Sequence, residues 1–152
     1  MKKIISMALV VIMLVCSAVT LTACGIPSDY KDAKANLEEK DYTVKVTTTD
    51  ALIKAELLVL GITDVDVDAL VEASKDEDGI DLIYCNDKDS ADKILEKIEK
   101  FIDESKQALD ELFEDKDSDE YKKAMDEFNK MKVGKSGTVV YMATEQALKD
   151  VK

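Results

Sequence analysis

Residues 65–74 alternate between apolar and polar side chains, and this alternation constrains the fold more than any other pattern in the chain. A period of two residues is that of a β-strand with one buried face. A polar turn over 75–79 follows and ends in a glycine, and the next run, 80–85, is rich in residues that favour strands. The sequence therefore predicts a β-hairpin over residues 65–86.

In the segments that precede the hairpin, apolar residues recur at the spacing typical of helices and strands. We predict a helix over 29–40, a strand over 42–47 and a helix over 51–60 that ends at Gly61. The helix over 51–60 is so rich in apolar residues that we expect it to be largely buried.

A long amphipathic helix is expected after the hairpin, beginning near Ser90. Its apolar stripe is interrupted over 114–120 and then resumes as far as Met131. The pattern therefore fits either one long helix or two helices in a hairpin. A strand over 138–142 and a short helix over 144–148 follow.

The centre of this element order is β-α-β-β-α-β. That is the order of a ferredoxin-like sandwich, an α+β fold in which helices cover one face of an antiparallel sheet, here with an added N-terminal helix and a short C-terminal helix. An unrelated α+β arrangement of the same elements is the alternative. The other sheet face would start out bare and carry Thr43, Lys45, Thr47, Leu70, Glu72, Ile83 and Cys85. The first or last helix or a second copy of the protein would cover it; otherwise it is a candidate binding surface.

The first 23 residues follow the order of a secretory leader. Lys2 and Lys3 precede an apolar run over 4–15, and small residues lead up to Cys24. The ending Leu-Thr-Ala-Cys, followed by Gly25, resembles the lipobox of bacterial lipoproteins. The resemblance implies that the signal peptide is removed and that a diacylglycerol is attached to the sulfur of Cys24. A plain signal peptide and an uncleaved anchor helix are the alternatives.

The same resemblance implies a domain organisation and a location. Residues 1–23 are the signal peptide, residues 24–27 are the lipidated N-terminus and a short tether, and residues 28–152 are a single α+β domain. The domain would lie at the extracytoplasmic face of the cell membrane, held by its lipid. The chain is also similar to the small uncharacterised lipoproteins of Gram-positive bacteria, a likeness that implies location and no mechanism. In a Gram-negative host the domain would face the periplasm.

Composition argues against several classes of function. The chain has no His and no Arg, and its net charge is −12. Without His there is no Ser-His-Asp or Cys-His nucleophile and no imidazole metal ligand. Without Arg or a basic surface, we expect no nucleic-acid partner. No carboxylate pair stands out for acid–base work, so we do not expect an enzyme.

Acidic clusters are the remaining motif-like features. The best match to the calcium loop of an EF-hand is the set Asp115, Asp117, Asp119 and Asp126. Glu120 stands where that loop has its glycine, so we read the segment as a solvated link between helices. We expect no metal here and no cofactor besides the diacylglycerol on Cys24.

These exclusions favour a non-catalytic lipoprotein that acts as an interaction or sensing module, through a protein partner or through self-association. The alternative is a lipoprotein that binds a small ligand or a divalent cation through its acidic surface. Cys85 is the one thiol left once the leader is removed and Cys24 is lipidated. Because it lies in the apolar run over 80–85, we expect a cysteine packed in a strand rather than a reactive one.

Replacing Cys24 by Ala tests the leader assignment. In cells grown with labelled palmitate, the natural protein should carry the label and enter the detergent phase of a Triton X-114 extract. Cys24→Ala should lose the label, because the acyl chains require that sulfur. Cys16→Ala changes a cysteine inside the leader and should be labelled normally. Retention of the label by Cys24→Ala would contradict the assignment.

Overall fold

The computed structural model describes residues 25–113 and 115–152, so the predictions for the leader and for Cys24 lie outside the described residues. Within this part of the chain, an antiparallel sheet has the strand order β1-β2-β3-β5-β4. Its strands are β1 (Thr43–Thr47), β2 (Val67–Lys75), β3 (Asp78–Cys85), β4 (Met131–Ser136) and β5 (Val139–Thr144). The helices are α2 (Tyr30–Glu39), α3 (Asp50–Val59), α4 (Lys88–Leu112), α5 (Asp119–Lys130) and α6 (Glu145–Asp150). The predicted α+β class is confirmed.

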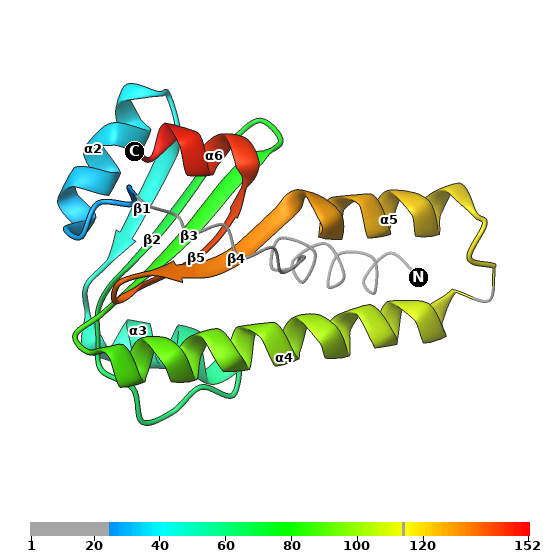
Figure 1. The fold of residues 1–152 in the computed structure, drawn as a ribbon, viewed down its shortest axis with the longest axis horizontal. Helices are drawn as coiled ribbons and strands as arrows, with labels where there is room; N and C mark the ends of the chain where they lie inside the picture. Colours follow the sequence, from blue (N-terminus) through cyan, green and yellow to red (C-terminus); the bar gives the residue numbers. More distant parts are fainter. Residues whose placement is uncertain (1–24, 114) are drawn as a thin grey trace.

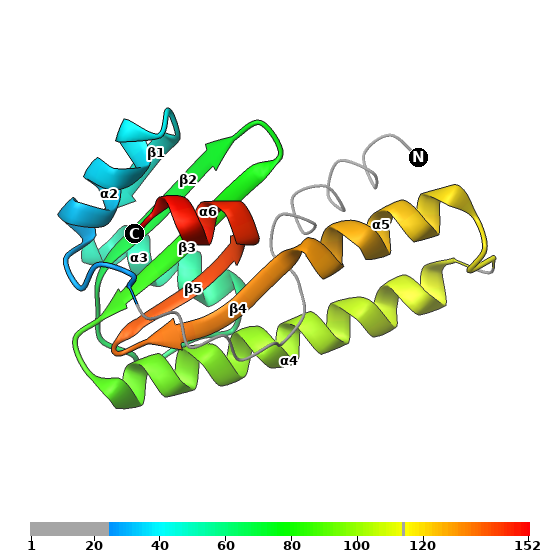
Figure 2. The ribbon, with the colours of Figure 1, turned by 45° about the horizontal axis from the view of Figure 1, so that its top comes forward.

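Helices cover both faces of this sheet, so the described residues form three layers (Figures 1 and 2). α2 and α6 lie on one face, and α3 and α4 lie on the other. The expectation of a bare face that includes Leu70 and Cys85 is wrong, because both side chains pack beneath α3 and α4. A sheet covered on both sides has apolar residues on both faces. All six residues of β5 are accordingly buried.

The strand order differs from the ferredoxin-like arrangement, which is not confirmed. A split βαβ unit brings strands joined through a helix into the sheet parallel to each other. Here β1 and β2 are joined through α3 but are antiparallel neighbours, with Thr47 opposite Leu70. The segment 60–66 returns the chain to the end of the sheet at which β1 finishes. The predicted β2–β3 hairpin is confirmed, with Lys75 opposite Asp78.

The structure adds an edge strand that the sequence pattern missed. β4 pairs with β5, from Met131 opposite Thr144 to Ser136 opposite Val139. In the sequence, Met131 continues the apolar stripe of the preceding helix, and the rest of β4 contributes one further large apolar residue, Val133. The period of two is therefore not visible over this segment, and pairing with β5 decides its conformation.

Gly134 on β4 is needed because of its neighbour on β5. A Cβ atom at this position would lie 2.5 Å from the hydroxyl oxygen of Tyr141 and 2.8 Å from its Cζ atom. The Tyr141 ring therefore occupies the space above the glycine backbone, where no side chain could fit. This packing holds the edge strand against the buried ring.

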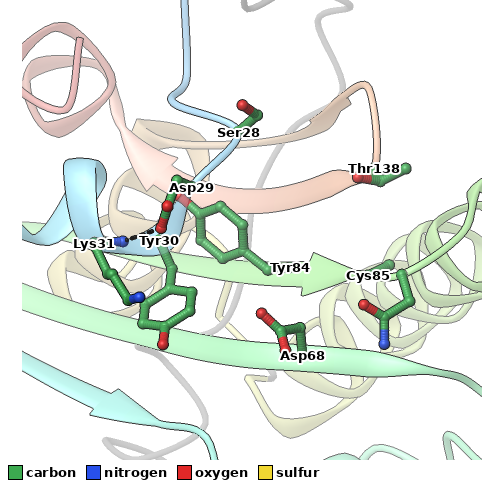
Figure 3. A pocket seen from close by; sticks show the side chains of 9 residues that line it. Ser28, Asp29, Tyr30, Lys31, Asp68, Tyr84, Cys85 and Thr138 are labelled. Carbon is green, nitrogen blue, oxygen red and sulfur yellow. Dashed lines mark hydrogen bonds between the residues drawn. The ribbon is translucent and has the colours of Figure 1, made fainter.

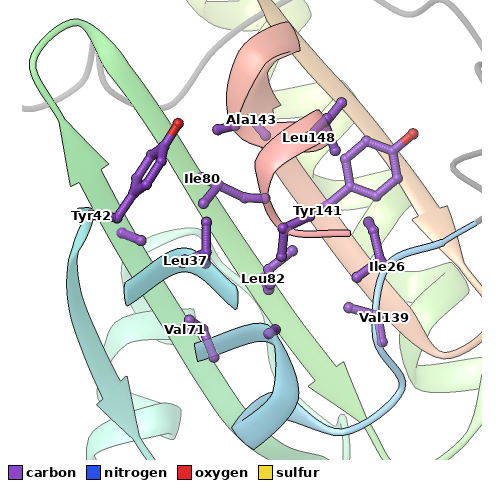
Figure 4. Packing of buried hydrophobic residues seen from close by; sticks show 14 of the residues in the cluster. Ile26, Leu37, Tyr42, Val71, Ile80, Leu82, Val139, Tyr141, Ala143 and Leu148 are labelled. Atoms are coloured by element: carbon purple, nitrogen blue, oxygen red, sulfur yellow. The ribbon is translucent and has the colours of Figure 1, made fainter. Parts of the chain in front are cut away.

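A first core lies between the sheet and helices α2 and α6 (Figure 4). Leu37 of α2 and Tyr141 of β5 are almost completely buried in it. Ile26 packs into the same core, so the chain joins the fold at the start of its described part. The side-chain amide of Asn36 donates to the carbonyl of Val151 at 3.0 Å and ties α2 to the C-terminal end. The beginning and the end of the described chain therefore lie on the same side of the sheet.

A second core lies on the opposite side, between the sheet and helices α3 and α4. Its helical members include Ile53 and Leu57 of α3 and Ile94, Ile98 and Ile102 of α4. The segment that fits either one helix or two forms two, α4 and α5, whose far ends project beyond the sheet (Figures 1 and 2). In the described ranges, no helix is long and apolar enough to cross a membrane.

Candidate functional site

Helix α3 is apolar on two opposite sides. On its inner side, Ile53 and Leu57 are 2 % and 3 % exposed and pack against the sheet. On its outer side, Leu52, Leu58 and Val59 are 56 %, 61 % and 84 % exposed. The expectation that this helix is largely buried is therefore wrong. Only two of the seven apolar residues of this helix are buried in the core, because a single helix against a sheet has one buried side.

We call the exposed apolar side of α3 the outer stripe. It consists of Ala51, Leu52, Ala55, Leu58 and Val59, which recur at helical spacing and are all exposed. Lys54 and Glu56 flank it on either side, since they lie about 100° around the helix from Ala55. Lys54 pairs with Asp50 at 2.8 Å, and Glu56 pairs with Lys45 at 3.3 Å. The charges beside the stripe are thus neutralised locally, and the stripe itself carries none.

The C-terminal end of α3 is held in place by hydrogen bonds and by packing, and this fixes the position of the outer stripe. Gly61 has φ = 65° and its N–H donates to the Leu58 carbonyl at 2.9 Å, as the sequence predicts for a helix stop. The N–H of Ile62 donates to the Leu57 carbonyl at 3.0 Å, which completes a Schellman motif. Ile62 is buried beside Leu57, so the helix end is anchored to the second core. The outer stripe is therefore held on a rigid element rather than on a loose loop.

A hollow of about 800 Å³ adjoins the outer stripe, between the end of α3 and the start of α4. We call it the α3 hollow. The apolar residues that line it are Leu57, Leu58, Ile62 and Val65, and we refer to them as its apolar floor. The charged residues that line it, which we refer to as its charged rim, are Asp64, Asp66, Asp87, Asp89, Lys54 and Lys93. Leu58 belongs to both the outer stripe and the hollow, so the two form one continuous surface.

Hydrogen bonds fix the acidic rim of the α3 hollow. The backbone N–H of Asp66 donates to the Ser90 hydroxyl at 2.9 Å, and the Asn86 amide donates to the Asp66 carboxylate at 2.7 Å. Asp87 caps α4 by accepting from the backbone N–H of Ser90 at 2.7 Å. This backbone hydrogen bond, and then the bond from the Ser90 hydroxyl, lower the pKa of Asp87. Asp87 therefore keeps its negative charge at neutral pH.

A charge cluster lies between α3 and the sheet and consists of Lys45, Glu56, Glu72 and Asp81. Lys45, Glu72 and Asp81 stand opposite one another on β1, β2 and β3. Lys45 donates to both Glu56 and Glu72, and so connects α3 to the sheet. Asp81 is partly buried, and burial followed by the charges of Glu72 and Glu56 raises its pKa to about 7. The pairing of Glu72 with Asp81 follows from the register of the β2–β3 hairpin. The predicted hairpin was therefore the only clue in the sequence to this cluster.

The acidic residues singled out in the sequence serve the link between α4 and α5. The Asp115 carboxylate accepts from the backbone N–H of Asp117 at 2.9 Å, and Asp117 pairs with Lys122 at 3.7 Å. Asp119 is the first residue of α5, and Asp126 lies further along that helix. Across the described ranges, no group of three or more acidic or cysteine side chains is arranged to hold a metal ion. The EF-hand spacing therefore does not bring these carboxylates together.

A second hollow, of about 480 Å³, lies beside the start of α2 (Figure 3). Asp29 caps α2 by accepting from the backbone N–H of Lys31 at 2.8 Å, and the Tyr84 hydroxyl donates to the Pro27 carbonyl at 3.2 Å. The rings of Tyr30 and Tyr84 meet edge to face, with centroids 6.1 Å apart. These contacts hold the segment before α2 and the start of that helix against β3. We therefore give the residues around the second hollow a structural role and not a binding role.

Cys85 also borders the second hollow, and it is buried on β3. Burial, and then the charges of Asp87 and Asp66, raise the pKa of this thiol to about 12. Because the thiolate is the nucleophilic form, the group stays protonated and unreactive at neutral pH. The prediction of a packed strand cysteine is confirmed.

In comparisons with known proteins, no protein-family model, no curated protein and no solved structure matches the chain. Three structural features bear on function: the outer stripe, the α3 hollow and the charge cluster.

The charge cluster predicts how stability depends on pH. The folded-state pKa of Asp81 lies above that of an unfolded Asp, so the native state disfavours its ionisation. The free energy of unfolding should fall as pH rises from about 4 to about 7, by on the order of 3 kcal/mol, and then level off. The chain has no His, so few other groups titrate between about pH 5 and 8.

Urea unfolding at a series of pH values measures this effect. Asp81→Asn should remove the fall and should be more stable than the natural protein at pH 8. Asp126→Asn changes an exposed carboxylate on α5 and should keep the natural profile. An unchanged profile in Asp81→Asn would show that the cluster does not control it.

Proposed function

We propose that this protein is a membrane-anchored, extracytoplasmic and non-catalytic interaction module that contacts another protein through the outer stripe of α3. The observation that carries the proposal is the exposure of Leu52, Leu58 and Val59 on one helix of an otherwise highly charged chain. Soluble surfaces rarely gather large apolar side chains in this way unless something covers them. In the described part of the chain, the other large hydrophobic exposed by more than half is Leu112, which lies on α4.

The place of the outer stripe in the fold suits a tethered protein. Ile26 is packed on the α2–α6 side of the sheet, and α3 lies on the opposite side (Figure 1). An anchor at Cys24 would therefore be only two residues from Ile26, which packs on the side away from the outer stripe. The net charge of −12 also repels anionic headgroups. Both features favour a protein, rather than the membrane, as the molecule that covers the stripe.

Covering the outer stripe would contribute favourable free energy to contact with a partner. Complete burial of a Leu or Val side chain contributes about 1.5–3 kcal/mol. The three large side chains of the stripe together could supply several kcal/mol, of which part offsets the entropy lost on association. The rigid end of α3 keeps that entropy cost small, because the stripe is already ordered before a partner arrives.

Photo-crosslinking of the intact lipoprotein in its own membranes tests the proposal. A benzoylphenylalanine placed at residue 59 should give an adduct of defined mass after irradiation, whether with a different protein or with a second copy. The same group at residue 112, another exposed apolar site on α4, is the matched control and should give no such adduct.

Adding Leu58→Ser to the position-59 variant should abolish the adduct, since it removes the neighbouring apolar contact. Equal adducts from residues 59 and 112 would contradict the proposal, because they would show that crosslinking does not depend on the outer stripe.

A further inference from the structure

The surface that adjoins the outer stripe specifies the chemistry of its partner. We infer that the partner presents a basic amphipathic helix, whose apolar side chains cover the outer stripe and whose Lys or Arg side chain enters the α3 hollow. This inference rests on the proposed function and names the kind of partner for the same site.

The shape of the outer stripe fits a helix. Ala55 lies at its centre, with Leu52 and Val59 along one side and Leu58 on the other, so large side chains border a shallow centre. Small residues at a crossing point let two helices approach to about 8–10 Å between axes. α3 is about 15 Å long, which matches two to three turns of a partner helix. An extended strand would leave the spaces between these ridges unfilled.

The charge of the α3 hollow requires a basic partner. Four carboxylates and two lysines line it, and both lysines already have partners. Lys54 pairs with Asp50 at 2.8 Å, and Lys93 donates to the Asp64 carbonyl at 3.5 Å. A cation that enters beside Leu58 would meet an excess of carboxylates over an apolar floor, which suits the long apolar stem and charged end of Lys or Arg.

A second copy of this chain fits the same surface poorly. Each copy has a net charge of −12, so two copies repel each other as they approach. The side of one short helix is also too small for a stable dimer, which buries about 800 Å² on each partner. The α3 hollow must therefore contribute to the interface, and its negative rim favours a partner of opposite charge.

Titration with designed peptides tests this inference. The probe is a fluorescein-labelled peptide of Leu and Lys with its leucines at helical spacing, and the comparison peptide has Glu at every Lys position. The intact protein is held in phosphatidylcholine nanodiscs, and the anisotropy of the peptide with empty nanodiscs is subtracted. The Leu–Lys peptide should bind at least tenfold more tightly than the Leu–Glu peptide. Raising NaCl from about 50 mM to about 500 mM should weaken its binding.

Two pairs of variants separate the stripe from the hollow. Leu58→Ser with Val59→Ser, and separately Asp64→Asn with Asp89→Asn, should each weaken Leu–Lys binding by about tenfold or more. Leu112→Ser and Asp126→Asn are the matched controls and should bind as the natural protein does.

Three results would overturn the inference. They are equal binding of the two peptides, binding that both variant pairs leave unchanged, and failure of the Leu–Lys peptide to bind at all. If the position-59 crosslink still forms in any of these cases, the proposed function stands and only the partner chemistry fails. If the crosslink is also absent, the proposed function fails with it.

Discussion

Burial of both faces of one sheet is the constraint on which the rest of the structure depends. β3 and β5 lie inside the sheet, and their side chains on either face need apolar cover. α2 and α6 supply it on one side, and α3 and α4 supply it on the other (Figure 2). α3 is only ten residues long and has just one side against the sheet, so its remaining apolar residues are left in water. The exposed apolar side chains of the outer stripe do not contribute to either core, so burial of the sheet does not account for them.

Electrostatics shape the surroundings of α3 in two opposite ways. Beneath it, Asp81 is partly buried beside Glu72, and Lys45 holds the cluster together, so this contact stabilises the native state less once Asp81 ionises. Beside it, the α3 hollow keeps an exposed acidic rim whose hydrogen bonds fix its shape. The first arrangement costs stability, and we propose that the second selects the charge of a partner. Both lie against the same helix, which makes α3 the centre of the proposed function.

Local patterns in the sequence predicted the elements better than their arrangement. The alternation over 65–74 and the polar turn over 75–79 were sufficient to predict the β2–β3 hairpin, and Gly61 was sufficient to predict the end of α3. β4 was missed because Met131 fits a helical period as well as a strand. The side of α3 that faces water could not be predicted either, since an apolar composition says nothing about which side is covered. The acidic spacing from Asp115 partly matches a metal motif, but the missing glycine favoured a link between helices, and the structure places Asp115 and Asp117 in that link.

The central claim is that the outer stripe is retained for contact with another molecule and not for the fold. The most direct test is the free energy of unfolding of the intact protein in urea, measured for Leu58→Ser with Val59→Ser. We expect a change of less than about 0.5 kcal/mol, whereas Leu57→Ala on the inner side of the same helix should cost about 2–5 kcal/mol. A loss of more than about 2 kcal/mol in the outer double variant would contradict the claim, because it would show that the stripe is packed within the fold.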